Sequence, residues 1–171
     1  MKKIENVHER GLRSPDGVAG TAAVTVGALI DGLAGPDDRL WPRERWPAMR
    51  LQQGLREGSE GGHGPIHYQL VEHRPGRLAR FRFTGSSGLI GEHRYELESA
   101  DEQSVILRHV LTARTEGRMR WQWPLVIGPF HDALMEDSLD HAQAIVTDTP
   151  YRSRRWPANV RTLRWLLEGL I

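Results

Sequence analysis

The chain between Gly64 and Val146 passes from an alternating pattern of polar and apolar residues to a helical one. In the clearest alternating stretch, Glu92–Glu98, the side chains of His93, Tyr95 and Leu97 share one face while charged residues occupy the other. A period of two is typical of a strand with one buried face. The pattern predicts four successive strands joined by short turns, which favours antiparallel hairpins: residues 66–73, 77–84, 92–98 and 104–114.

After residue 119 the apolar residues recur every three to four positions, which is the period of an amphipathic helix. Pro124 and Pro129 interrupt the early part, so we expect the continuous helix to begin near Gly128. The acidic residues of this helix are expected to form an outer face in contact with water: Asp132, Glu136, Asp137 and Asp140.

Weaker patterns flank this block. They predict a first strand at 3–12, a helix at 18–33, a short helix or turn at 36–45 and a strand at 48–55. The glycine-rich stretch 57–64 is expected to be a hairpin loop, because it lacks the lysine of a phosphate-binding loop. A basic link after Pro150 leads to a final helix, Ala158–Leu170, whose apolar side must cover its own domain or a second subunit.

This order of elements predicts the fold class α+β, because strands and helices do not alternate in the βαβ manner of parallel sheets. We expect a curved antiparallel sheet of about six strands wrapped on a long C-terminal helix, with an extra terminal helix. The predicted organisation is a single domain, residues 1–149, followed by a helical extension, residues 150–171, packed on that domain or on a partner.

Composition narrows the classes of function. The 23 basic and 22 acidic residues nearly cancel, so we expect no nucleic-acid partner. There is no cysteine, which excludes disulfides and thiolate chemistry. No apolar run approaches the roughly 20 residues of a membrane-spanning helix, so stable membrane insertion is not expected. Lys2 and Lys3 are not followed by an apolar segment, which argues against a secretory signal and favours a cytoplasmic protein.

Three histidines are the candidate chemical groups. A hairpin loop centred near Asp101 would place His93 directly opposite His109, with Cβ atoms about 5 Å apart. His131 lies on the apolar side of the long helix and could approach the pair. These imidazoles could be neutral core groups that are hydrogen-bonded to each other, to Tyr95 or to water. They could also bind a ligand's carbonyl or hydroxyl group, or transfer a proton in catalysis. No short metal-ligand spacing is present, so neither a metal nor a cofactor is expected.

Four segments resemble the SRPBCC superfamily, the helix-grip fold of START lipid-transfer domains, polyketide cyclases and dehydrases, and the birch-pollen allergen group. They are Leu40–Leu51, RFRFTGSSGLIGEHRYELE, Leu107–Leu111 and WPLVIGPFHDALMEDSLDHAQ, within a similarity that spans about Lys3–Thr147. These are signatures of a fold, and the superfamily has no catalytic motif common to all members. The resemblance implies a deep, largely apolar pocket between the sheet and the long helix.

The resemblance also suggests which residues bind a ligand. Trp41 and Trp46 would lie near the pocket mouth, where they either gate it or cap the core. The full expected set consists of aromatic, aliphatic and histidine side chains: Trp41, Trp46, Tyr68, Phe81, Phe83, His93, Tyr95, Leu107, His109, Trp123, Phe130, His131 and Leu134.

The function expected from this pocket is the binding of a small hydrophobic or amphipathic molecule, such as a lipid. Two alternatives stay open. One is a polyketide cyclase- or dehydrase-like enzyme that uses a cavity histidine for proton transfer. The other is a protein-interaction module without a ligand, in which the C-terminal helix makes the contact or forms a homodimer.

Overall fold

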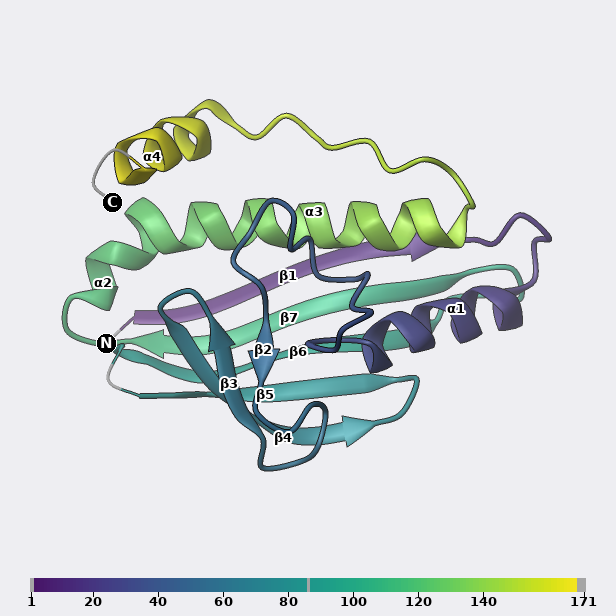
Figure 1. Ribbon diagram of the computed structural model, residues 1–171, viewed down its shortest axis with the longest axis horizontal. Coiled ribbons are helices and arrows are strands. Elements are labelled where there is room, and N and C mark those ends of the chain that lie inside the picture. Colours follow the sequence, from purple (N-terminus) through teal and green to yellow (C-terminus); the bar gives the residue numbers. More distant parts are fainter. Residues whose placement is uncertain (1, 86, 169–171) are drawn as a thin grey trace.

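A seven-stranded antiparallel sheet forms the body of the described part of the chain, residues 2–85 and 87–168 of the computed structural model (Figure 1). Its strand order is β1-β7-β6-β5-β4-β3-β2. The strands are β1 (Lys2–Leu12), β2 (Arg50–Leu51), β3 (Glu60–His63), β4 (Ile66–Arg74), β5 (Leu78–Thr84), β6 (Leu89–Ser99) and β7 (Val105–Thr115). The predicted α+β class is confirmed, and the alternating stretches form the central strands.

The helices are α1 (Ala19–Asp31), α2 (Met119–Gln122), a π-helical segment η1 (Trp123–Ile127), α3 (Gly128–Val146) and α4 (Ala158–Glu168). The long helix α3 begins at Gly128, as predicted, and η1 leads directly into it. A Cβ atom on Gly128 would lie 2.9 Å from the carbonyl oxygen of Trp123, so the wide turn requires glycine there. The predicted end of the last helix at Leu170 lies outside the described residues.

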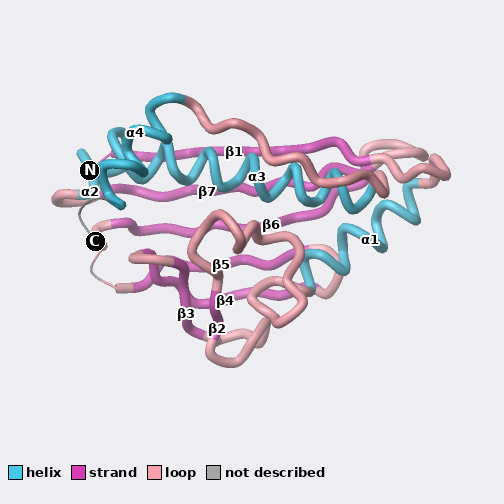
Figure 2. The backbone as a smooth tube through the Cα atoms, turned by 45° about the horizontal axis from the view of Figure 1, so that its top comes forward, coloured by secondary structure: helices cyan, strands magenta, loops and turns pink. Residues whose placement is uncertain are grey.

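The elements are arranged in layers. Helix α3 lies across one face of the sheet, and the C-terminal extension runs back along α3, which places α4 near α2 (Figures 1 and 2). The main core lies between sheet, α1 and α3, and it includes Val160 of α4, which is 1% exposed. The extension therefore packs on its own chain. None of the described helices is both long and apolar enough to cross a membrane.

The glycine-rich stretch differs from its prediction. Residues 60–63 form strand β3 rather than a hairpin loop, and the predicted strand 48–55 is reduced to the two residues of β2. A Cβ atom on Gly61 would lie 1.9 Å from the carbonyl oxygen of Arg50, and one on Gly62 would lie 2.1 Å from that of Ile66. The glycines let three backbones approach closely, which alternation cannot reveal.

The pairing of the β6–β7 hairpin also differs. His93 is paired with Leu111, and His109 is paired with Tyr95, so the predicted opposition of His93 and His109 is wrong by two residues. The connection between Ser99 and Val105 is centred one residue later than expected. A shift of two positions leaves each side chain on its predicted face, because the side-chain period of a strand is two.

The acidic residues of α3 do not form a purely solvated face. Asp137 is 1% exposed, and β1 lies beneath the others with polar side chains facing them. Arg10 Nη2 lies 3.0 Å from Glu136 Oε2, and Arg10 Nη1 lies 3.0 Å from Asp140 Oδ1. The solvated-face prediction is therefore wrong for Asp137, because α3 is packed between the sheet on one side and the C-terminal extension on the other. Asp132 is exposed, as predicted.

Candidate functional site

A cavity of about 470 Å³ lies between the sheet and the first turns of α3. Strands β5, β6 and β7, the β3–β4 turn, η1, α3 and the loop around Trp41 and Trp46 contribute to its walls, and Arg164 of α4 also borders it. Most of the lining side chains are apolar, and the polar ones are chiefly histidines. Such a composition is typical of pockets that bury small organic molecules.

Nine of the thirteen predicted site residues border this cavity: Trp41, Trp46, Phe83, His93, His109, Trp123, Phe130, His131 and Leu134. The other four are fully buried outside the lining and support it from the core: Tyr68, Phe81, Tyr95 and Leu107. That the lining residues bind a ligand stays a prediction.

The structure adds lining residues that the sequence patterns did not single out: Pro47, His63, Gly64, Pro65, Ile66, Leu89, Leu111, Val126, Ile127, Met135 and Arg164. For some of them, the sequence pattern could have indicated a position next to the cavity. Leu111 shares the inward face of β7 with His109, and Met135 follows the lining residue Leu134 on α3. His63 carried none, because its glycine-rich surroundings show no hydrophobic period.

His93 and His109 form the polar part of the inner wall. His93 Nδ1 and His109 Nε2 lie 3.2 Å apart, so the two side chains share a hydrogen bond although they are not directly opposed. Phe81 and Phe83 each stack on His93 with ring centroids 5.0 Å away, and Tyr95 packs edge-on against His109 at 4.8 Å. The aromatic neighbours fix both rings in place.

Burial keeps this pair neutral. Loss of hydration lowers the pKa of His93 and of His109 well below the ordinary value, and repulsion from the neighbouring histidines acts in the same direction. A neutral imidazole has one donor and one acceptor nitrogen. His93 Nε2 and His109 Nδ1 are buried without a hydrogen-bond partner among the described residues, so one hydrogen-bonding position on each ring is unused.

A second polar group comes from β3 and β4. His63 Nδ1 lies 3.0 Å from the Tyr68 hydroxyl, and the ring of Trp41 packs on His63 at 4.7 Å. Burial lowers the pKa of His63 to about 3, with repulsion from His131 as a smaller cause. Burial also raises the pKa of Tyr68 well above its ordinary value. Both groups are therefore uncharged near neutral pH.

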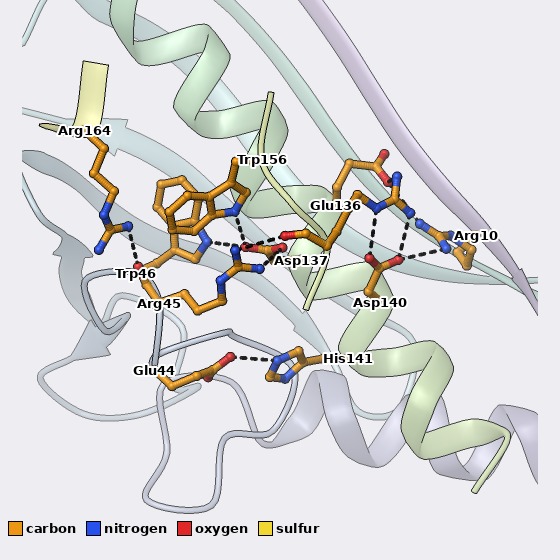
Figure 3. Close-up of polar contacts among 11 residues, drawn as sticks. Arg10, Glu44, Arg45, Trp46, Glu136, Asp137, Asp140, His141, Trp156 and Arg164 are labelled. Carbon is orange, nitrogen blue, oxygen red and sulfur yellow. Dashed lines mark hydrogen bonds and ion pairs between the residues drawn. The ribbon is translucent and has the colours of Figure 1, made fainter. Parts of the chain in front are cut away.

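One buried carboxylate, that of Asp137, binds the side chain of the lining residue Trp46 (Figure 3). Arg45 Nη1 and Trp46 Nε1 each donate to it at 2.7 Å, and Trp156 Nε1 donates at 2.9 Å. The Arg45 guanidinium also lies over the Trp156 ring, 4.0 Å from its centroid. Asp137 thus connects α3, a lining tryptophan and the C-terminal extension.

Helix α4 adds a further contact to the loop that carries Arg45 and Trp46. Arg164 Nη1 donates to the backbone oxygen of Arg45 at 2.8 Å, and its guanidinium lies 4.7 Å from the Trp156 ring (Figure 3). Arg164 borders the cavity as well. The extension therefore contributes a residue to the lining of the cavity.

Neither a protein-family model nor a curated protein matches the chain. Several solved structures are similar to it. The match to a conserved protein of unknown function from Enterococcus faecalis covers 99% of this chain and 87% of the other, at 12% identity and a TM-score of 0.59. CalU16 from Micromonospora echinospora matches over 95% of this chain and 82% of its own, at 15% identity and a TM-score of 0.54.

A third structure is norcoclaurine synthase from Thalictrum flavum in complex with dopamine and hydroxybenzaldehyde. It covers 80% of this chain and 85% of its own, at 12% identity and a TM-score of 0.51. Likenesses at such low identity show the arrangement of the backbone and not the chemistry. The chain has the helix-grip fold.

Proposed function

We propose that this chain is a member of the SRPBCC superfamily that binds a small apolar or amphipathic molecule in the cavity beneath α3. The observation that carries the proposal is the cavity itself, whose volume of about 470 Å³ lies within the range of small-molecule sites. Burial of the ligand's apolar part against the aromatic lining supplies affinity at about 25 cal/mol per Å² removed from water.

The neutral histidines define the polar end of this ligand. His93 and His109 each retain one unpartnered nitrogen and border the cavity. A carbonyl or hydroxyl group can form a hydrogen bond with such a nitrogen. The free-energy cost of removing that group from water is then small, because a hydrogen bond to the protein replaces one to water. The proposed ligand is therefore mainly apolar, with an uncharged oxygen at the end that lies against the two histidines.

A cavity-filling substitution tests this proposal. Leu134→Trp on α3 is expected to weaken binding of a hydrophobic fluorescent dye, anilinonaphthalene sulfonate, by at least about 10-fold, because the added ring occupies space next to the histidines. Leu125→Trp is the matched control, since Leu125 is 66% exposed and does not border the cavity. Equal dye binding by both variants would count against the proposal.

Native mass spectrometry gives a second readout. Freshly purified protein is expected to carry a co-purifying small molecule that is reduced or absent in Leu134→Trp and retained in Leu125→Trp. A wild-type protein that carries no molecule and binds no dye would refute the binding function.

A cyclase- or dehydrase-like enzyme is the second candidate, favoured by the unpartnered nitrogens of the His93–His109 pair. The lowered pKa values make both imidazoles weak bases near neutral pH, which favours binding over proton transfer. Incubation of a co-purified molecule with wild type and with His109→Gln distinguishes the two functions. A mass change produced by the wild type alone indicates catalysis, whereas an unchanged mass with both proteins indicates binding.

A further inference from the structure

The interface between β1 and α3 contains a second cluster of chemically active side chains, at one edge of the cavity. His8 on β1, together with the consecutive residues His131 and Asp132 on α3, brings two imidazoles and a carboxylate together. One ligand atom from each residue lies within 4.8 Å of the others. The strand and the helix are far apart in the sequence, so the three residues do not form a metal-binding motif with short spacing.

The distances in the cluster suit a shared ion better than direct hydrogen bonds. Asp132 Oδ1 lies 3.5 Å from His8 Nε2 and 3.6 Å from His131 Nδ1. Two ligands that each lie about 2.0–2.2 Å from a tetrahedral zinc ion are separated by roughly 3.3–3.6 Å. The separation of the Asp132 carboxylate oxygen from each imidazole nitrogen therefore already fits two ligand–ligand distances of such a tetrahedron, and the two imidazole nitrogens lie within 4.8 Å of each other.

Three of the four imidazole nitrogens in this cluster lack a hydrogen-bond partner among the described residues. Both ring nitrogens of His131 and Nδ1 of His8 are buried without a hydrogen bond among the described residues. A buried polar atom without a partner destabilises the folded state, and native structures rarely leave several together. A bound ion would coordinate one nitrogen from each ring and so offset part of this destabilisation.

A neighbouring side chain orients the carboxylate. Asn6 Nδ2 donates to Asp132 Oδ1 at 2.8 Å, and a carboxylate oxygen has a second lone pair for an ion. Such outer partners are typical of protein metal sites. The ring of His109 lies 5.2 Å from that of His131, so the cluster continues into the histidines of the inner wall.

We propose that His8, His131 and Asp132 bind one divalent transition-metal ion, with Zn²⁺ as the best fit. Two neutral imidazoles and one carboxylate are ligands that zinc accepts readily, and this chain has no cysteine that would favour a softer metal. Because His131 borders the cavity, the fourth coordination position is available to water or to a polar group of a cavity ligand. This inference does not depend on the proposed ligand-binding function.

Titration of chelator-treated protein with Zn²⁺ tests the inference. The wild type is expected to bind one equivalent by isothermal titration calorimetry, and Co²⁺ at the same site should give the intense visible absorption of four-coordinate cobalt. His8→Ala, His131→Ala and Asp132→Ala should each weaken Zn²⁺ binding by at least about 100-fold, since even loss of an outer partner costs about 10- to 100-fold.

Two further variants separate site loss from misfolding and from surface binding. Asp132→Asn preserves the shape of a half-exposed residue, so it should keep the fold by circular dichroism while Zn²⁺ affinity falls. His67→Ala is the matched control, because His67 is exposed on β4 and lies outside the cluster. Uptake below one equivalent, or an equal loss in His67→Ala and His131→Ala, would overturn the proposal. Unchanged Zn²⁺ affinity in a folded Asp132→Asn would also overturn it.

Discussion

Replacing Asp137 by alanine is expected to lower the free energy of unfolding by about 3–5 kcal/mol. The substitution leaves the Arg45 guanidinium without its carboxylate and removes the acceptor of the Trp46 and Trp156 indole N–H groups. Breaking a buried ion pair by removing one partner has an effect of about this size. For a chain of 171 residues this corresponds to a fall of about 10 °C in Tm, measurable by urea and thermal unfolding.

A neighbouring acid on the same helix provides the control. Glu136 is half-exposed and pairs with Arg10 at 3.0 Å and with Arg154 at 3.4 Å. Exposed ion pairs contribute little, so Glu136→Ala should cost less than about 1 kcal/mol. If both variants lose the same stability, the hydrogen bonds of Asp137 contribute no more than an exposed ion pair does.

Asp137→Ala is also expected to loosen the C-terminal extension, which a measurement of global stability does not detect. Without Asp137 the extension loses the hydrogen bond that joins Trp156 to α3, and the exposed arginines of residues 152–155 should become more accessible to trypsin. Limited proteolysis under native conditions is expected to cleave this segment faster in Asp137→Ala than in Glu136→Ala. Cleavage at equal rates would show that other contacts hold the extension.

The role of Asp137 could not be predicted from the sequence, although the helix that carries it could. Periodicity identifies which side of α3 faces the sheet, but it cannot show that the loop around Trp46 and the extension cover the opposite side. A carboxylate on that side therefore looked solvated. Its two tryptophan partners lie far from it in the sequence, and no local pattern links an indole N–H to a distant acid.

The sheet was more predictable because each strand carries its own signal. The alternation of β6 and β7 correctly placed His93, Tyr95 and His109 on the inner face. The pairing of these strands depends on which loop residues close the hairpin, and several centres are compatible with one pattern. This explains why the contact between His93 and His109 is present while their direct opposition is not.

The cavity was predictable only through the resemblance to a fold. Alternation can assign a residue to the interior, but it cannot distinguish a packed interior from a hollow one. Tyr68 and Phe83 carry the same signal, yet Tyr68 lies in the solid core and Phe83 borders the cavity. The distinction depends on how α3 and the sheet pack against each other, which the pattern of a single strand does not contain.

Mild acid is expected to destabilise the protein strongly. Burial lowers the pKa values of His63, His93 and His109 in the folded chain, that of His63 to about 3, whereas the unfolded chain titrates near 6.5. Below about pH 6.5 the unfolded state binds protons that the folded state does not, so stability falls as the pH is lowered. These three histidines together give a slope of about 4 kcal/mol per pH unit. Burial also lowers the pKa of His8, which acts in the same direction.

Urea unfolding between pH 7.5 and 5.0 measures this slope. His109→Gln removes one of the three groups, so its stability should fall less steeply with decreasing pH, by about 1.4 kcal/mol per unit, even if it starts lower at pH 7.5. His67→Gln changes an exposed histidine and should keep the wild-type slope. A His109→Gln slope equal to that of wild type would mean that His109 is protonated within the folded chain. That result would also remove the neutral imidazole pair on which the proposed binding of an uncharged oxygen depends.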